Sequence, residues 1–260
     1  MPNWCSNYLH ITTGSREHLD QVAEKFKKTP FFANIYPTPD ILHEIDKRRV
    51  LATETGNCWN TLFNTGLTND QTASYLNCLT NGMVEVGRTE PISLDAYLEE
   101  KFSGISDVVR QLFVKEAQEI TGIPVTTLTE AVMCILEACD GFVSSCDWQT
   151  KHWGTKQDVE CISFEEDSAT SMNASFETVW NPPIAFFRYF SKQLPKTEFE
   201  LSYYDQCNNI CGKMLFKNGI AIVIDADSDE IMRDLKKRKK TTVPLDKLAG
   251  NQDYAVKFCT

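Results

Sequence analysis

The feature that most constrains the fold is a β-strand pattern that occurs on both sides of a long helical stretch. Residues 3–12 (NWCSNYLHIT) alternate between two faces, which is typical of a strand. Residues 13–28 follow with a Gly-Ser start and apolar residues at helical spacing, so the chain begins β-α. Beyond residue 146 the pattern continues as strand, strand, helix, strand, in the ranges 159–166, 171–178, 181–194 and 197–204.

Without the helical stretch, this order is β-α-β-β-α-β, followed by a hairpin around Asn218-Gly219 and a C-terminal helix. We therefore expect an α+β fold: a ferredoxin-like split βαβ antiparallel sandwich with a large helical insertion after the first β-α unit. The expected domains are a ferredoxin-like domain (1–42 plus 146–225), a helical insertion (43–145), and a C-terminal helix and tail (226–260).

The charge of the chain argues against a basic nucleic-acid-binding surface. The net charge is −10, and outside residues 236–240 (KKRKK) 21 basic residues face 36 acidic ones, a net charge of −15. Affinity for nucleic acid depends on neutralising phosphates, so nucleic acid is an unfavoured partner. The basic run leaves two interpretations open: a solvated helix end, which suits the helix dipole, or a tether for nucleic acid or an acidic partner. Its members are Lys236, Lys237, Arg238, Lys239 and Lys240.

Composition and terminal sequence predict a cytoplasmic protein with reduced thiols. No apolar run approaches the ~18 residues of a membrane span, and the start of the chain lacks a signal-peptide pattern. The ten cysteines are then mostly packed thiols. Only Cys207 and Cys211 (CNNIC) have a spacing that resembles a metal site. A zinc site needs two further ligands, so a turn with two half-buried thiols is the favoured interpretation.

Motifs for catalysis are missing from the sequence. It contains no nucleophile elbow, phosphate loop, dinucleotide fingerprint or HExxH motif. His152, beside Trp153, could act as a general base, but a structural role is favoured because no partner residue is visible near it. We expect no enzyme activity, no cofactor and no metal.

Four short segments occur in order along the chain. They are MPNWCSNYLHITTG at the start, FFANIYPTPDIL at 31–42, HWGTKQD at 152–158 and FETVWNPP at 176–183. This set resembles the YubB-like family with a ferredoxin-like domain, whose members are encoded by phages, plasmids and integrated elements of bacteria. The resemblance implies the fold and a mobile-element origin in a bacterial host cell; it implies no reaction.

The candidate binding residues lie in these segments and on the outer face of the sheet. Trp4, Trp153 and Trp180 are expected around the open end of the sheet. Some ferredoxin-like domains bind RNA by stacking bases on aromatic residues of the central strands, and Tyr8 would lie on that face. Acidic residues share it and would repel phosphate: Glu177, Glu198 and Glu200.

Two functional hypotheses follow. The first is a non-enzymatic acidic interaction protein of a phage or mobile element that binds and blocks a host defence protein, such as a nuclease or CRISPR effector, with carboxylates in place of phosphates. The alternative is a nucleic-acid-binding protein that uses the basic C-terminal helix with Lys236–Lys240.

Overall fold

The computed structural model describes residues 3–51, 55–63, 83–84, 92–142, 144–159, 161–205, 210–224, 231 and 233. The chain divides into two compact units. The first contains Met1–Tyr36 and His152–Thr260, and the second contains Pro37–Lys151. The sequence placed these divisions after residues 42 and 145. No described helix has the length and apolar character that crossing a bilayer requires.

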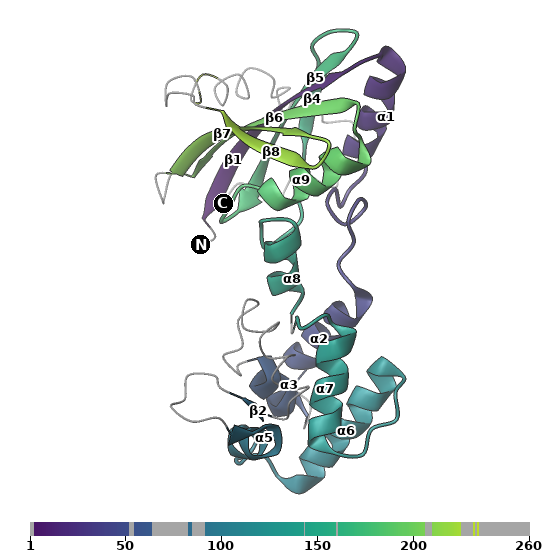
Figure 1. The fold of residues 1–260 in the computed structure, drawn as a ribbon, viewed down its shortest axis with the longest axis vertical. Coiled ribbons are helices and arrows are strands. Elements are labelled where there is room, and N and C mark those ends of the chain that lie inside the picture. The colour runs from purple at the N-terminus through teal and green to yellow at the C-terminus, as the bar shows by residue number, and fades with distance from the viewer. Residues whose placement is uncertain are drawn as a thin grey trace, which may run out of the picture. The chain divides into compact units, whose positions relative to one another are not determined.

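The first unit is built on one antiparallel sheet, which Figure 1 shows as a twisted layer with α9 beside it. In the described residues the strand order is β4-β5-β1-β6-β7-β8. Its elements are β1 (Trp4–Thr13), α1 (Arg16–Phe26), β4 (Ser163–Glu166), β5 (Ser171–Val179), α9 (Ile184–Gln193), β6 (Thr197–Asp205), β7 (Ile210–Lys217) and β8 (Ile220–Ile224).

The topology confirms the ferredoxin-like fold class predicted from the sequence. β1 lies between β5 and β6 and is antiparallel to both, so each β-α-β unit is split by a strand of the other. β7 and β8 extend the sheet beyond β6 and form a hairpin with a two-residue turn. Asn218 and Gly219 have φ values of 48° and 78°, the left-handed backbone that a type I′ turn requires.

A cluster of phenylalanines forms the core between the sheet and its two helices. Phe187 and Phe190 of α9 contact Phe199 of β6 at ring-centroid distances of 5.8 and 5.1 Å. Phe26 of α1 lies 6.3 Å from Phe190, so both helices cover the same face of the sheet. The β1 side chains on this face include Leu9 and Ile11, which are fully buried.

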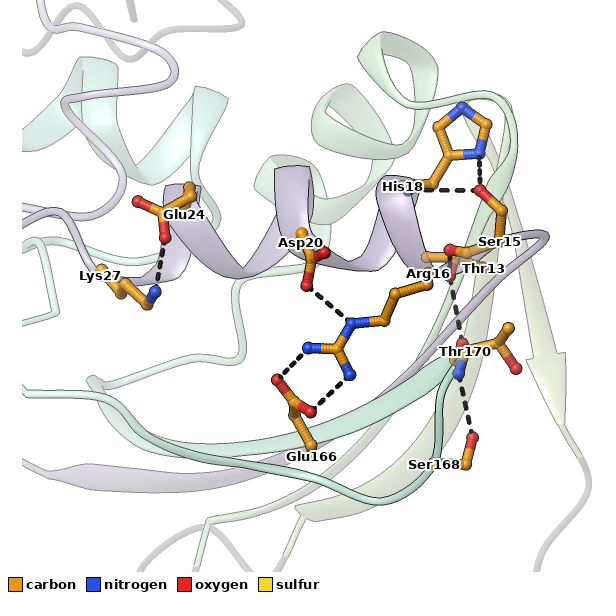
Figure 2. Close-up of polar contacts among 10 residues, drawn as sticks. All are labelled: Thr13, Ser15, Arg16, His18, Asp20, Glu24, Lys27, Glu166, Ser168 and Thr170. Carbon is orange, nitrogen blue, oxygen red and sulfur yellow. Dashed lines mark hydrogen bonds and ion pairs between the residues drawn. The ribbon is translucent and has the colours of Figure 1, made fainter.

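An ion pair connects α1 to the edge strand β4, as Figure 2 shows. The Arg16 guanidinium donates two hydrogen bonds, of 2.7 and 2.8 Å, to the Glu166 carboxylate and a third, of 2.9 Å, to Asp20. Arg16 holds the pKa of Glu166 below its usual range, because it stabilises the ionised form.

The opposite face of the sheet is partly covered near its centre. Ile231 is 2% exposed and packs against Tyr8, with Tyr204 beside them. Tyr8 is consequently only 7% exposed, although the alternation of β1 places it on the outer face as expected. Ile231 and Arg233 are helical, in agreement with the helix expected there; the rest of that region lies outside the described residues.

The second unit is mainly helical, as expected, but it also contains a short strand pair that the sequence pattern did not indicate. Trp59 and Phe113 pack in its core, and Glu116 accepts a 2.7 Å hydrogen bond from the Trp59 indole. Its described elements are α2 (Asp40–Val50), α3 (Gly56–Phe63), β2 (Met83–Val84), β3 (Ile92–Ser93), α5 (Leu94–Lys101), α6 (Asp107–Thr121), α7 (Leu128–Ala138) and α8 (Ser145–His152).

Candidate interaction surface

The start of β1 and the end of β5 meet at one end of the sheet. Trp4 pairs with Val179 in the strand register, and the Trp180 N–H donates a 2.8 Å hydrogen bond to the Asn3 carbonyl. The Asn3 side-chain amide donates to both carboxylate oxygens of buried Asp205, at 2.9 and 2.8 Å. Two of the four sequence segments are therefore fixed side by side.

The HWGT segment packs directly on the start of α9. The Thr155 hydroxyl donates a 2.8 Å hydrogen bond to the Val179 carbonyl, and the Phe186 N–H donates to the Trp153 carbonyl at 3.2 Å. Gly154 has φ 87°, and a Cβ there would lie 3.0 Å from the Pro182 carbonyl oxygen. Only glycine satisfies both the backbone conformation and this close approach.

Asp158 connects the same segment to the FFANIYP segment. Its carboxylate accepts hydrogen bonds from the N–H groups of Phe32, Ala33 and Val159, at 2.8, 2.7 and 2.7 Å. Burial raises the pKa of the Asp158 carboxyl above its usual value and outweighs the opposing effect of these donors. Parts of all four segments, all within the first unit, therefore meet at one end of the sheet.

Most of the aromatic residues at this end belong to the core. Trp153 is 1% exposed and donates a 2.9 Å hydrogen bond to the Tyr36 carbonyl. Tyr36 in turn stacks on Tyr189 and meets the ring of His152 edge-on, at 5.4 Å. Trp153 and His152 thus have packing roles in the fold, so Trp153 is not available as the binding residue that the sequence suggested.

Two tryptophans of the same segments remain at the surface. Trp4 is 47% exposed and Trp180 is 42% exposed. Trp180 has φ 74°, a left-handed conformation that is strained for a bulky residue. The Lys156 ammonium lies 5.0 Å from the Trp180 ring centroid, in a cation–π arrangement. Lys156 was missed as a candidate, although it stands within the quoted HWGTKQD segment.

The acidic residues predicted on the outer face have different surroundings. Glu177 is exposed and pairs with Ser6 in the strand register, two residues from Trp4. Glu198 and Glu200 instead form ion pairs with Lys217 and Lys213 of the neighbouring strand β7. The outer face is consequently less acidic at β6 than the sequence indicated, because β7 was not expected to supply lysines opposite these glutamates.

Some predicted sites fall outside the described residues. These are the basic run Lys236–Lys240 and Cys207 of the CNNIC pair; Cys211 lies in β7 and is exposed. Among the residues that the structure describes, no group of three His, Cys, Asp or Glu side chains could hold a metal ion.

Cys5 is a packed thiol in the central strand β1, as predicted. It is fully buried, and burial raises its pKa to about 12 from the ordinary value of 9.0. Because the thiolate is the reactive form, we expect iodoacetamide at about pH 8 to modify Cys5 at least about a thousandfold more slowly than exposed Cys161. Timed alkylation with peptide mass spectrometry measures both rates. Similar rates in the folded chain would contradict this assignment; similar rates in concentrated urea are the control.

Comparison with known proteins places a family match on the C-terminal part of this unit. Residues 160–244 match the family model described as the ferredoxin-like domain in Api92-like protein. This region is similar to that ferredoxin-like domain. The matched region holds β4 to β8, while the central strand β1 lies outside it.

A solved structure, that of protein api92 from Yersinia pseudotuberculosis, is also similar. Its sequence is 14% identical, the match covers 87% of this chain and 99% of that chain, and the TM-score is 0.39. The comparison with curated proteins finds no match.

Proposed function

We propose that this chain is a non-enzymatic protein-binding protein whose contact surface is centred on Trp4 and Trp180. The observation that carries the proposal is the exposure of these two side chains, at 47% and 42%, where the other described aromatic residues of the four segments are packed in the fold. Trp is among the residue types most enriched at the energetic centres of protein interfaces, so two exposed tryptophans at one end of the sheet favour this function.

The energetics support a tight contact at this end of the sheet. A large aromatic side chain buries about 150–250 Å² when it is fully covered, so covering the exposed halves of both rings would contribute about 4 kcal/mol at about 25 cal/mol per Å². The hydrogen bond from Trp180 to Asn3 fixes the backbone in advance, which lowers the entropy lost on binding.

The partner we propose is a basic surface of a bacterial host protein that normally meets nucleic acid, such as a defence nuclease or CRISPR effector. The net charge of −10 would accelerate association with such a surface, and Glu177 lies on the sheet face near Trp4. The YubB-like resemblance supports a mobile-element origin and action in the host cytoplasm. Blocking the partner would need no catalytic group of this chain.

The test is a pull-down with the tagged chain from nuclease-treated bacterial lysate, at low and high salt. We expect one host protein in stoichiometric amount, released by salt. The double variant Trp4→Ala, Trp180→Ala should weaken binding of that purified protein by about a hundredfold or more. The matched control is Val108→Ala, Leu112→Ala, which removes exposed apolar side chains of α6 and should leave binding within about twofold.

The nucleic-acid alternative gives a different result in the same experiment. Recovery of many proteins that nuclease abolishes, together with a shift of labelled single strands that is lost when Lys236–Lys240 become alanine, would replace the protein-binding proposal. Burial of Tyr8 under Ile231 disfavours base stacking on the central strands, since the ring face is not accessible. Binding that survives the tryptophan double variant would remove the proposed surface.

A further inference from the structure

The strand β8 forms an apolar edge of the described sheet. Its sequence is IAIVI, without charge or proline, and Ile220, Ile222 and Val223 are 61%, 53% and 75% exposed. Ile220 and Ile222 pair with outer-face residues of β7, so their side chains lie on the outer face of the sheet. Val223 lies on the face that α9 covers. An edge of this kind is a template for a further strand, and soluble proteins normally protect it.

The main chain of β8 has unused hydrogen-bonding groups. Lys217 and Ile220 flank the two-residue turn and exchange both hydrogen bonds, as do alternate pairs along the hairpin. The N–H and C=O groups of Ala221 and Val223 therefore point away from β7. In the described part of the chain, these groups have no hydrogen-bond partner outside the hairpin. An added strand would find two donors and two acceptors in regular spacing.

The opposite edge of the sheet, strand β4, is protected by charged side chains. β4 carries Glu165 and Glu166, and Arg16 of α1 holds the Glu166 carboxylate with two hydrogen bonds (Figure 2). A charged side chain on an edge strand opposes pairing with another strand. Within the described residues, charged side chains therefore protect the β4 edge of the sheet but not the β8 edge.

Two cations of α9 lie beside the β7–β8 turn, next to the start of β8, on the helix-covered face. Arg188 donates a 3.2 Å hydrogen bond to the Gly219 carbonyl, and a Cβ on Gly219 would lie 3.2 Å from the Lys192 Cβ. Both side chains are exposed, and within the described residues neither forms an ion pair with a carboxylate. A strand added to β8 would place alternate side chains next to these cations and the others next to Ile220 and Ile222.

We propose that β8 binds an extended peptide segment of a partner protein by strand addition, and that this segment alternates apolar and acidic residues. Main-chain hydrogen bonds to Ala221 and Val223 supply affinity, and the alternation supplies specificity. Apolar side chains of the segment cover Ile220 and Ile222 on the outer face. Acidic side chains meet Arg188 and Lys192 on the other. Strands β6 and β7 separate β8 from β1 and β5, at the ends of which Trp4 and Trp180 lie. Binding at β8 therefore goes beyond the proposed function.

A second copy of this chain is a poorer occupant of the same edge. A stable interface between proteins typically buries about 1,200–2,000 Å² and involves about 25 residues on each side. Pairing of two five-residue strands buries far less than this area. Two paired copies would also place Arg188 and Lys192 of both chains near the shared strand edge, and both chains carry a net charge of −10. Both effects bring like charges together, which disfavours pairing.

The probes for the test are fluorescein-labelled seven-residue peptides of alternating Val and Glu or of alternating Val and Lys, measured by fluorescence anisotropy with the full chain. We expect the Val-Glu peptide to bind at least about tenfold more tightly. Val223→Pro removes an outward N–H without touching the bonds to β7, and should weaken binding about tenfold or more. Val223→Thr keeps that N–H and should stay within about twofold. Arg188→Glu with Lys192→Glu should reverse the peptide preference.

Three results would overturn the proposal. Equal binding by the Val223→Pro and Val223→Thr variants would show that the edge main chain is not used. A dimer in analytical ultracentrifugation that Val223→Pro dissociates would make a second copy the occupant. Peptide binding that appears only when the chain is truncated after Arg233 would make its own C-terminal residues the occupant.

Discussion

Asp158→Ala is expected to destabilise the first unit by about 3 kcal/mol or more. The substitution removes the acceptor of three hydrogen bonds, from the N–H groups of Phe32, Ala33 and Val159. A buried donor without a partner costs about 1–3 kcal/mol. Native-state hydrogen exchange with mass spectrometry measures the effect, because it reports β1 and α9 separately from the second unit.

Two matched variants separate the hydrogen bonds from the loss of a charge. In Asp158→Asn the amide oxygen can still accept from Phe32 and Val159, which share Oδ1, so about half of the loss is expected. Asp20→Ala removes an exposed aspartate that pairs with Arg16 and should cost less than about 1 kcal/mol. Equal effects for Asp158→Ala and Asp20→Ala would show that the Asp158 bonds contribute nothing to stability.

The fold class was predictable because it depends on local patterns. Alternation in residues 3–12 and the Asn218-Gly219 turn determine β1 and the hairpin within a few residues, and the order of elements then leaves few topologies. The short strands β2 and β3 were missed since two residues each are too few for a period to be visible.

The candidate surface was harder to predict because it depends on which residues face one another across the sheet. The sequence indicated an acidic face at Glu198 and Glu200, but both residues form ion pairs with lysines of the neighbouring strand β7. Tyr8 was correctly placed on the outer face, yet its burial depends on Ile231, more than two hundred residues away. A pattern within one strand contains neither kind of information.

The quoted segments were informative as a set, but their individual roles could not be assigned from the sequence. Gly154 and Asp158 hold other segments in place, whereas Trp4 and Trp180 have no comparable packing role. The sequence-based prediction made no distinction between Trp153 and the other two tryptophans, because the residue type alone does not show whether a tryptophan is buried or exposed. Only the three-dimensional contacts separate residues that maintain the fold from those that remain for binding.

Gly154→Ala is the second substitution with a large expected effect, about 3 kcal/mol of destabilisation. A left-handed backbone costs a residue with a Cβ about 1–2 kcal/mol, and φ at Gly154 is 87°. The new Cβ would also lie 3.0 Å from the Pro182 carbonyl oxygen and 3.2 Å from the Ile184 nitrogen. Both atoms are main chain at the start of α9, so neither can move without displacing the helix.

Two other glycines divide this effect into its parts. Gly122 has φ 70° but open space around a Cβ, so Gly122→Ala should lose only the conformational part, about 1–2 kcal/mol. Gly14 has open space and no left-handed backbone, so Gly14→Ala should change stability by less than about 0.5 kcal/mol. Hydrogen exchange again reads the two units separately. If Gly154→Ala costs no more than Gly122→Ala, the close approach to α9 is not needed, and the HWGT segment does not hold the end of the sheet on which Trp180 is presented.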